Sequence, residues 1–344
     1  MTERLADHTT FRLGGPATDY VRCTDSEQLV EVVARADRDG VPVLLIGGGS
    51  NLVVADDGFD GLVVDIASTG VEAESDACGG ALVTVAAGEG WDDFVARAVA
   101  EGWIGVEALS GIPGSVGATP IQNVGAYGQE VADAIARVRT WDRQARAIRT
   151  YAASECGFGY RSSRFKADPS RHVVLSVTFQ LRIGDLGAPV GYAELARSLG
   201  VELGGRAPAT DVRDAVLALR AGKGMVLDDA DPDTWSAGSF FTNPVLDPAL
   251  VPEGAPSWPQ PSPDSGHAAQ VKTSAAWLIE HAGFTKGYLR GRAGVSTKHT
   301  LALTNRGGAT TAELLALASE VRDGVREKFG ITLVNEPVLV GCTL

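Results

Sequence analysis

Two glycine-rich segments constrain this chain more than any other feature of its sequence. The first, Gly47–Asn51, directly follows the fully apolar run Val43–Ile46, which we predict to be a short buried strand. The second, Gly111–Gly128, holds five glycines in eighteen residues, mixed with hydroxyl and amide side chains. Glycine has no Cβ, so the backbone N–H groups of such loops can approach an anion closely. The pair of loops fits one long ligand that lies across two adjoining α/β units.

Each loop also has a plainer interpretation. The run Gly47-Gly48-Gly49-Ser50-Asn51 suits an ordinary tight turn, and the second segment suits a structural loop with several turns. The first run does not match the G-x-G-x-x-G fingerprint of dinucleotide-binding domains, because Leu52 stands where its last glycine should be. A Rossmann fold is therefore not expected.

The length of 344 residues exceeds what one hydrophobic core usually supports, so we expect several compact units. Apolar periodicity predicts strands and helices of ordinary length. The predicted strands are 19–22, 43–46, 52–54, 62–66, 82–86, 138–142, 147–151, 173–181 and 331–340. The predicted helices lie near 29–36, 91–100, 212–219, 274–282 and 311–328, and Pro252–His267 is expected to be a surface excursion. We place the units at 1–67, 68–209 and 210–330, with 331–344 returning to the first.

Composition excludes several classes of function. The charge of −13 and the absence of Lys or Arg blocks disfavour binding to nucleic acid. The cysteines, Cys23, Cys78, Cys156 and Cys342, show no metal or disulfide spacing, so we expect reduced and mostly buried thiols and no metal. No signal-peptide pattern or long apolar run is visible, which predicts a cytoplasmic protein without membrane insertion.

Three further segments carry groups suited to charge stabilisation or proton transfer. Arg161 lies among aromatic and hydroxyl neighbours and could clamp a carboxylate through two parallel hydrogen bonds. Ser239 stands between a glycine and two phenylalanines, where a dry pocket is expected, and Glu336 lies near the last predicted strand. The alternatives are a surface salt bridge for Arg161, a turn serine for Ser239, and a solvated or paired carboxylate for Glu336.

The order of these motifs resembles that of the UDP-N-acetylenolpyruvoylglucosamine reductases, the MurB family of peptidoglycan synthesis. The resemblance rests on seven blocks in the same order along nearly the whole chain, which makes it very specific. These blocks are 47–51, 110–128, 160–166, 238–244, 275–283, 296–304 and 335–337. Tyr192 resembles the tyrosine of the longer family subtype, which closes a loop over the substrate.

This resemblance implies an α+β fold, with a two-part FAD-binding region of the vanillyl-alcohol-oxidase-like type and a smaller α/β substrate-binding domain. It also implies bound FAD, NADPH as the reductant, and UDP-N-acetylglucosamine enolpyruvate as the substrate. The implied catalytic residues are Arg161, Ser239 and Glu336. The implied FAD-binding residues are Gly47, Gly48, Gly49, Ser50, Asn51, Ser110, Gly111, Ile112, Pro113, Gly114, Gly117, Ala118, Gln122, Asn123, Gly125, Ala126 and Tyr127. The implied substrate-binding residues are Tyr160, Tyr192, Lys223, Asn243 and His281.

Two positions depart from the family pattern. His281 stands where many relatives place a glutamine, so it either contacts the substrate or is a core or rim histidine. The surroundings of Lys223 match the family only loosely. In the implied reaction Arg161 stabilises developing negative charge and Ser239 donates a proton. An ionised Glu336 would oppose that charge, so we expect it to be protonated or paired with a cation when substrate is bound.

Two other functions compete with this interpretation. One is an FAD-dependent alcohol oxidase of the same fold, in which Ser239 and Glu336 would have no evident task. The other is a nucleotide-sugar binding module that has lost turnover, which the presence of Arg161, Ser239 and Glu336 argues against. We expect the protein to be a monomer.

Overall fold

The computed structural model describes residues 3–76, 79–260 and 270–344, and the chain divides into two compact units. The first unit comprises Ala17–Gly48 and Asp60–Val226. The second comprises the described residues before Ala17, together with Gly49–Phe59 and Leu227–Leu344. The chain therefore passes from one unit to the other within the first glycine run, between Gly48 and Gly49. The expected three-part division at 67, 209 and 330 remains a prediction.

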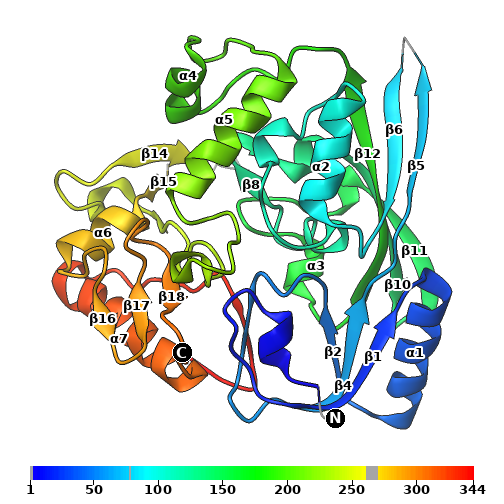
Figure 1. The fold of residues 1–344 in the computed structure, drawn as a ribbon, viewed down its shortest axis with the longest axis horizontal. Helices are drawn as coiled ribbons and strands as arrows, with labels where there is room; N and C mark the ends of the chain where they lie inside the picture. The colour runs from blue at the N-terminus through cyan, green and yellow to red at the C-terminus, as the bar shows by residue number, and fades with distance from the viewer. Residues whose placement is uncertain (1–2, 77–78, 261–269) are drawn as a thin grey trace. The chain divides into compact units, whose positions relative to one another are not determined.

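The first unit contains a three-stranded sheet of order β1-β4-β2, with helix α1 beside it (Figure 1). These elements are β1 (Ala17–Cys23), α1 (Ser26–Asp39), β2 (Val43–Ile46) and β4 (Phe59–Ile66). The Asp25 side chain accepts a hydrogen bond from the Gln28 N–H at the start of α1, and Gly40 ends the helix in a left-handed conformation. Strands β2 and β4 run parallel, so the first glycine loop starts at a fixed strand end.

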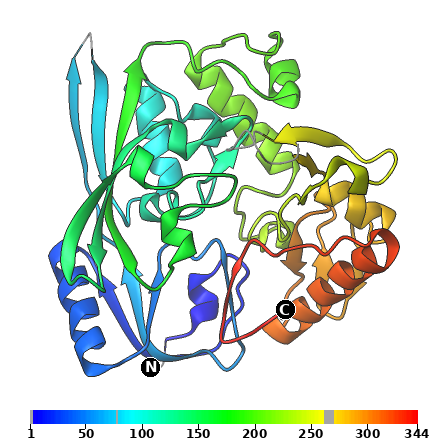
Figure 2. The same cartoon turned by 180° about the vertical axis from the view of Figure 1, so that it is seen from behind.

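A larger antiparallel sheet of order β11-β10-β12-β6-β5, with β7 added beside β12, forms the rest of the first unit's framework (Figure 2). Its strands are β5 (Val71–Asp76), β6 (Gly80–Ala86), β7 (Trp103–Ile104), β10 (Ile135–Asp142), β11 (Ala147–Ala152) and β12 (His172–Ile183). Helix α2 (Trp91–Ala100) packs on this sheet through Trp91 and Phe94, which meet Phe179 of β12 in one aromatic cluster. This cluster supports the segment that carries the second glycine loop.

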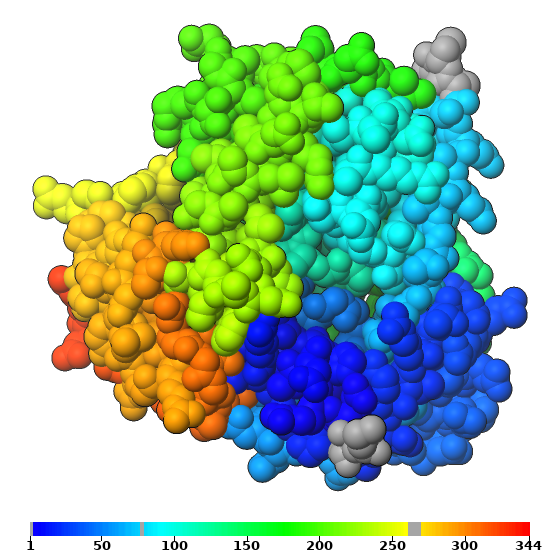
Figure 3. Space-filling model, in the orientation of Figure 1, coloured from blue at the N-terminus to red at the C-terminus, as the bar shows by residue number. Residues whose placement is uncertain are grey.

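The remaining elements of the first unit surround the second glycine loop. They are the hairpin β8 (Gly125–Ala126) and β9 (Gln129–Glu130), and the helices α3 (Arg164–Ala167), α4 (Ala193–Leu199) and α5 (Ala209–Gly222). Helices α4 and α5 share a small apolar core that includes Leu195, Val212 and Val216. Helix α5 is prominent at the surface in the space-filling view (Figure 3).

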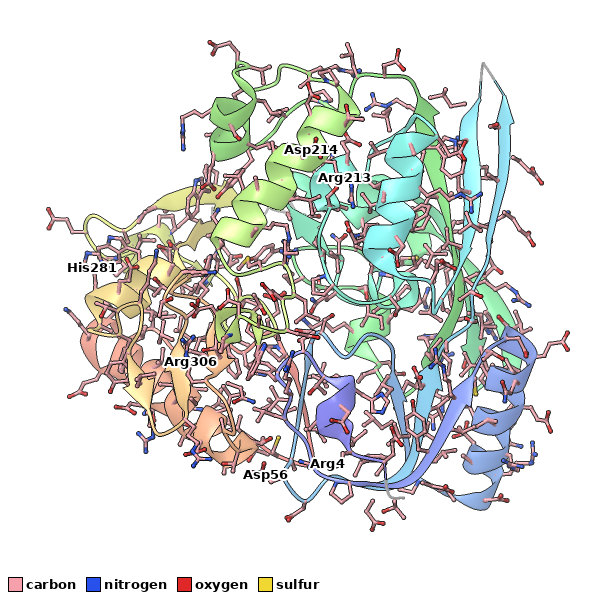
Figure 4. The ribbon with its side chains drawn as sticks, in the orientation of Figure 1. Arg4, Asp56, Arg213, Asp214, His281 and Arg306 are labelled. Carbon is pink, nitrogen blue, oxygen red and sulfur yellow. The ribbon has the colours of Figure 1, made fainter. Side chains whose placement is uncertain are left out.

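The second unit consists of short sheets around helices α6 (Ala275–His281) and α7 (Thr311–Phe329). Its strands are β3 (Leu52–Val54), β13 (Val245–Leu246), β14 (Ser257–Gln260), β15 (Gln270–Thr273), β16 (Leu289–Arg290), β17 (Ala293–Val295), β18 (Leu303–Asn305) and β19 (Val338–Val340). The C-terminal strand β19 pairs in parallel with β3. Asp56, which follows β3 and is labelled in Figure 4, accepts hydrogen bonds from the first N–H groups of α7. The C-terminal strand thus lies beside residues 52–54 within this unit.

Most predicted elements are confirmed, including all the predicted helices and the strands before residue 182. The predicted strand 331–340 is wrong in extent, because only Val338–Val340 is a strand. Ile331 and Leu333 pack into the core, and Pro337 has no N–H to donate to a sheet. None of the helices in the described part of the chain is both long and apolar enough to cross a membrane.

Of the predicted thiols, Cys23 and Cys156 are buried, and both are free, as is the partly exposed Cys342. Cys78 lies outside the described residues. So does the second part of the predicted excursion Pro252–His267, whose first part includes β14.

A buried carboxylate at the end of β10 holds the edge of the large sheet together. Asp142 is fully buried, and its oxygens accept hydrogen bonds from Arg171 at 2.8 and 3.1 Å and from the Gln144 and Ala145 N–H groups. These bonds, above all those from Arg171, hold the pKa of Asp142 well below its usual range. The carboxylate therefore stabilises the fold in its ionised form.

We expect Asp142→Asn to lower the free energy of unfolding at pH 7 by about 2–3 kcal/mol, because Arg171 and two backbone donors lose a charged acceptor. Because the folded-state pKa lies below the unfolded value of about 4, this contribution is complete above about pH 5 and is lost as the pH falls further. Urea unfolding at pH 7 and pH 3 should therefore show a smaller difference between wild type and variant at pH 3. Asp214→Asn, a change at the exposed Asp214 of α5 (Figure 4), is the control. Equal losses at both pH values would contradict this assignment.

Candidate active site

The first two glycines of the run 47–51 lie against the second glycine loop. A methyl group added to Gly48 would lie 2.6 Å from Gly114 Cα, and one added to Gly47 would overlap Ser115 Oγ. Real Cβ atoms essentially never come so close to a backbone atom, so the two loops meet main chain to main chain. Position 48 therefore requires glycine, whereas a Cβ at position 47 would displace the Ser115 hydroxyl, and the plain tight turn does not account for these contacts.

The rest of the run belongs to the second unit. Gly49 has a φ of +57°, and a Cβ there would overlap the carbonyl of His8. Asn51 is bound at both its side chain and its backbone: Nδ2 donates to the Glu336 carbonyl at 3.4 Å, and its carbonyl accepts from the Val338 N–H. The segment therefore connects the predicted FAD loop to the segment before β19 that carries the predicted catalytic Glu336. Ser50 lies between these anchored positions and is half-buried.

The second glycine loop is tied to helix α2. The Trp91 N–H donates to the Gly114 carbonyl at 3.0 Å, and Asp92 accepts from the Gly111 N–H at 2.6 Å. Asp92 also receives two hydrogen bonds from Arg213 of α5 (Figure 4). Although burial alone would raise it, these bonds from Arg213 and Gly111 lower the pKa of Asp92. The ionised Asp92 carboxylate thus links the second glycine loop to helices α2 and α5.

The other predicted FAD-binding residues follow along the same loop. Gly117 packs on Ala87, where a Cβ would lie 2.5 Å from the alanine methyl group. Ser110 and Asn123 are buried, Pro113 and Ala118 are exposed, and the remaining ones are partly buried. Those remaining ones are Gly111, Ile112, Gly114, Gln122, Gly125, Ala126 and Tyr127.

Arg161 is held by the backbone of the second loop. Its guanidinium donates to the carbonyls of Asn123 at 3.2 Å and Gly125 at 2.7 Å, and it lies 5.5 Å from the ring of Tyr160. The buried Asn123 side chain in turn donates to Glu130 and to the Gly159 carbonyl. The predicted catalytic arginine is therefore fixed on the loop predicted to bind FAD.

Strained backbone conformations are concentrated among the predicted site residues of the first unit. Five non-glycine residues of the described chain have positive φ, and three of them, Asn123, Tyr127 and Arg161, are predicted site residues with φ of 46–51°. A left-handed backbone at a residue with a side chain is unfavourable and persists only where the surroundings enforce it. Strain of this kind is concentrated at functional sites in proteins.

Tyr127, Tyr192 and Lys223 form a second cluster in the first unit. The two tyrosine rings meet edge to face at 5.5 Å, and Lys223 Nζ lies 5.5 Å from the Tyr127 ring. Lys223 also forms an ion pair of 2.5 Å with Glu194, in the first turn of α4. Burial raises the pKa of Tyr127 above its ordinary value. The structure thus brings together two of the predicted substrate-binding residues.

Ser239 and Glu336 are joined through the backbone of the second unit. The Glu336 N–H donates to the Phe240 carbonyl at 2.8 Å, and the following residue, Phe241, forms a β-bridge with Asn335. Phe240 and Phe241 are buried, whereas Ser239 is half-buried, and no hydrogen bond of its hydroxyl is found within the described residues. The predicted proton donor and the predicted carboxylate are therefore neighbours, while Arg161 belongs to the other unit.

The last two predicted substrate residues lie at helix α6. Asn243 Oδ1 accepts from the Ala275 N–H at 2.9 Å, at the start of this helix. His281, labelled in Figure 4, is exposed and stacks on Trp277 with ring centroids 3.8 Å apart. A core position for His281 is thereby excluded, whereas a rim position or a ligand contact is compatible with this geometry.

Arg220 is the residue that sequence reasoning missed. Its exposed fraction is 8 %. Within the described residues, its Nη2 donates a hydrogen bond to the Met225 carbonyl, whereas its Nε is buried and has no hydrogen-bond partner. A methyl group on Gly111 would lie 3.3 Å from this Nε, and burial lowers the pKa of Arg220. The sequence feature that could have identified Arg220 is its spacing of four residues from Val216 and of eight from Val212. This spacing places an arginine on the buried face of α5.

Comparison with known proteins agrees with this geometry. Residues 17–151 match the family model of an FAD binding domain, and residues 231–340 match that of the UDP-N-acetylenolpyruvoylglucosamine reductase C-terminal domain. The UDP-N-acetylenolpyruvoylglucosamine reductase of Cutibacterium acnes is 59% identical over 99% of this chain and 90% of its own length. That of Thermobifida fusca is 56% identical over 99% and 97%.

A solved structure leads to the same family. The UDP-N-acetylenolpyruvylglucosamine reductase (MurB) of Thermus caldophilus has a TM-score of 0.66 and 26% identity, with 99% of each chain covered. The expected α+β fold with an FAD-binding region and a smaller C-terminal domain is confirmed. At this identity and coverage, the chain belongs to the family of UDP-N-acetylenolpyruvoylglucosamine reductases.

Proposed function

We propose that this protein reduces the enolpyruvyl ether of UDP-N-acetylglucosamine enolpyruvate to UDP-N-acetylmuramate, with NADPH as the reductant and FAD as the bound cofactor. The observation that carries the proposal is the 59% identity, over almost the full chain, to a protein named for this reductase activity. The reaction belongs to the synthesis of peptidoglycan precursors. We also propose that the enzyme acts in the cytoplasm as a monomer.

The residues of the first unit fit FAD on two physical grounds. Gly48 lies directly against Gly114, so two glycine-rich loops of the kind that suits a diphosphate lie side by side. Beside them, Arg220 is a buried cation with an unused Nε–H and no carboxylate in ion-pair contact within the described residues. A buried cation is costly unless an anion compensates it, and FAD carries a diphosphate and an electron-accepting ring. We assign the two glycine loops and Arg220 to FAD.

FAD bound there would supply the redox chemistry that side chains lack, namely acceptance of hydride from NADPH and its delivery to the methylene carbon of the enolpyruvyl group. Addition of that hydride leaves an electron pair on the adjacent carbon, which spreads into the neighbouring carboxylate. Arg161 is proposed to stabilise this charge, and the hydrogen bonds that hold its guanidinium at the carbonyls of Asn123 and Gly125 support this role. Preorganised donors of this kind contribute about 3–4 kcal/mol to such a transition state.

Ser239 completes the reduction by donating a proton to that carbon. The carbanion is a far stronger base than an alkoxide, so this proton transfer is favourable. The absence of a hydrogen-bond partner for Ser239 within the described residues leaves the hydroxyl able to face a ligand. Glu336, bound through its N–H to Phe240, is proposed to be protonated or paired with a cation in the substrate complex.

The substrate is proposed to contact Tyr160, Tyr192, Lys223, Asn243 and His281. Tyr192 would close over it, as in the longer subtype of the family, and its partial exposure of 43% is compatible with such a movement. Lys223 would bind the diphosphate, because a lysine ammonium is a strong point charge for phosphate.

The proposed activity is tested by a visible spectrum of the purified protein. A flavin band near ~450 nm should bleach with NADPH and recover when the enolpyruvyl sugar is added without oxygen. Fast recovery in air that is independent of the sugar would favour the oxidase. A colourless protein that binds UDP-sugar would favour the binding module.

We expect Ser239→Ala to leave flavin reduction by NADPH near normal and to slow reoxidation by substrate at least about a hundredfold, since a positioned general acid contributes this much. Stopped-flow absorbance separates the two half-reactions. Ser236→Ala is the matched control, because it removes a nearby hydroxyl that accepts from the Gly238 N–H. Equal losses in both half-reactions of Ser239→Ala would remove Ser239 from the role of proton donor.

We expect Arg220→Met to weaken FAD binding about tenfold or more, because a hydrogen bond to a charged group contributes about 1.5–3 kcal/mol. The FAD-free protein should be as stable as wild type or more so, since replacing a buried, uncompensated cation by an apolar side chain is not destabilising. FAD fluorescence titration and thermal unfolding of the FAD-free protein measure the two effects. Arg197→Met, the same charge change at an exposed position, is the control. Unchanged FAD affinity in Arg220→Met would contradict the assignment.

A further inference from the structure

Lys223 forms an ion pair with a carboxylate of the protein itself. Its Nζ lies 2.5 Å from Glu194 Oε2, and both side chains are only about a third exposed, at 27% and 34%. The hydrogen bond from Lys223 to Glu194 outweighs burial, and the pKa of Lys223 is raised. Burial alone would lower it, so the carboxylate is what keeps this ammonium well compensated.

The place of Lys223 is defined on its other side by Tyr127. The ammonium lies 5.5 Å from the centre of the Tyr127 ring, and the Tyr192 ring meets that ring edge to face. The backbones that carry the two tyrosines also meet, because a methyl group on Gly128 would lie 2.9–3.1 Å from the atoms of Gly191. Glu194 follows Tyr192 by two residues, so the tyrosine and the carboxylate reach this cluster from one short segment.

A diphosphate that binds Lys223 must come close to Glu194. Two like charges a few ångströms apart repel by about 1–4 kcal/mol at the dielectric of a partly exposed site. The Lys223 ammonium has three N–H donors but only one positive charge. It therefore compensates one neighbouring anion far better than it compensates the Glu194 carboxylate and the two charges of a diphosphate together. The ion pair of Lys223 with Glu194 therefore opposes the binding of an anionic ligand at the same ammonium.

We propose that Glu194 is an affinity-setting residue of the substrate site: its carboxylate competes with the substrate diphosphate for Lys223 and must give up this ion pair when the nucleotide sugar binds. This inference rests on the proposed function, which assigns the diphosphate to Lys223. Breaking the ion pair weakens the binding of every ligand whose phosphate contacts Lys223, whereas a ligand without phosphate leaves the pair intact. Glu194 thus lowers the affinity for UDP-linked ligands, which favours release of the product.

The test uses the FAD-loaded enzyme and UDP as the probe. Glu194→Gln keeps the shape of the side chain and removes its charge, so the Kd of UDP should fall about three- to fivefold, the range that a partly exposed ion pair supports. The gain should shrink as salt is added, because the repulsion that it relieves is screened. The Kd of uridine, which carries no phosphate, should not change. Isothermal titration at two salt concentrations measures these values.

Two further variants complete the experiment. Glu202→Gln removes the same charge from an exposed position of the same segment and should leave the Kd of UDP unchanged. Lys223→Met should weaken UDP binding, and adding Glu194→Gln to it should bring a smaller gain than in the wild type, because the competition for Lys223 is gone and only direct repulsion is left to relieve. The inference is overturned if Glu194→Gln leaves the Kd of UDP unchanged or raises it, or if its gain is as large without Lys223.

The proposed function is tested separately on the wild-type enzyme, by the oxidation of NADPH that depends on the enolpyruvyl sugar. An active wild type with an unchanged Glu194→Gln variant rejects only the role of Glu194. An inactive wild type rejects the proposed reaction, whatever the affinity of the variants for UDP.

Discussion

The main-chain contact between Gly48 and Gly114 is the constraint on which the first unit's candidate site depends. The first glycine run leaves β2 at a fixed point, and the second loop is held by hydrogen bonds from α2 and by the Asp92 carboxylate. Neither loop could approach the other so closely with a Cβ at Gly48. The framework therefore fixes both loops from outside, and the glycines allow them to meet.

Three arginines of the first unit differ in what compensates their charge. Arg171 and Arg213 each bind a carboxylate through two or more hydrogen bonds, and these pairs tie strands and helices together. Arg220 is more deeply buried than either, yet among the residues that the structure describes its side chain donates to a backbone carbonyl alone. A guanidinium bound only by a neutral carbonyl keeps its positive potential, which suits it to an anionic ligand and makes it costly without one. The same contrast explains why Lys223 needs Glu194 while no ligand is bound.

The sequence predicted those parts of the structure whose signal is local. The strand before Gly47 and the helices α1, α2 and α7 follow from apolar spacing and from capping residues that act within a few positions. It did not predict the end of the chain well, because apolar Ile331 and Leu333 serve the core without being in a strand. The pairs Lys223–Glu194 and Arg161–Asn123 join residues 29 and 38 positions apart, and no spacing rule predicts such contacts. The motifs thus located the candidate site, whereas the groups that compensate its charges required the structure.

The strained residues show how the parts of the site depend on one another. A left-handed backbone at Asn123, Tyr127 and Arg161 costs about 1 kcal/mol or more at each position, and glycine would avoid that cost. Glycine would also remove a side chain that is in use: the Asn123 amide bonds Glu130, the Tyr127 ring meets Lys223, and the Arg161 guanidinium bonds the loop itself. Each strained residue is thus retained where its backbone turns the chain and its side chain holds another member of the site. The strained backbone is retained because it directs all three side chains into the site. Two of them come from the second glycine loop, and Arg161 comes from the turn between Gly159 and Ser162.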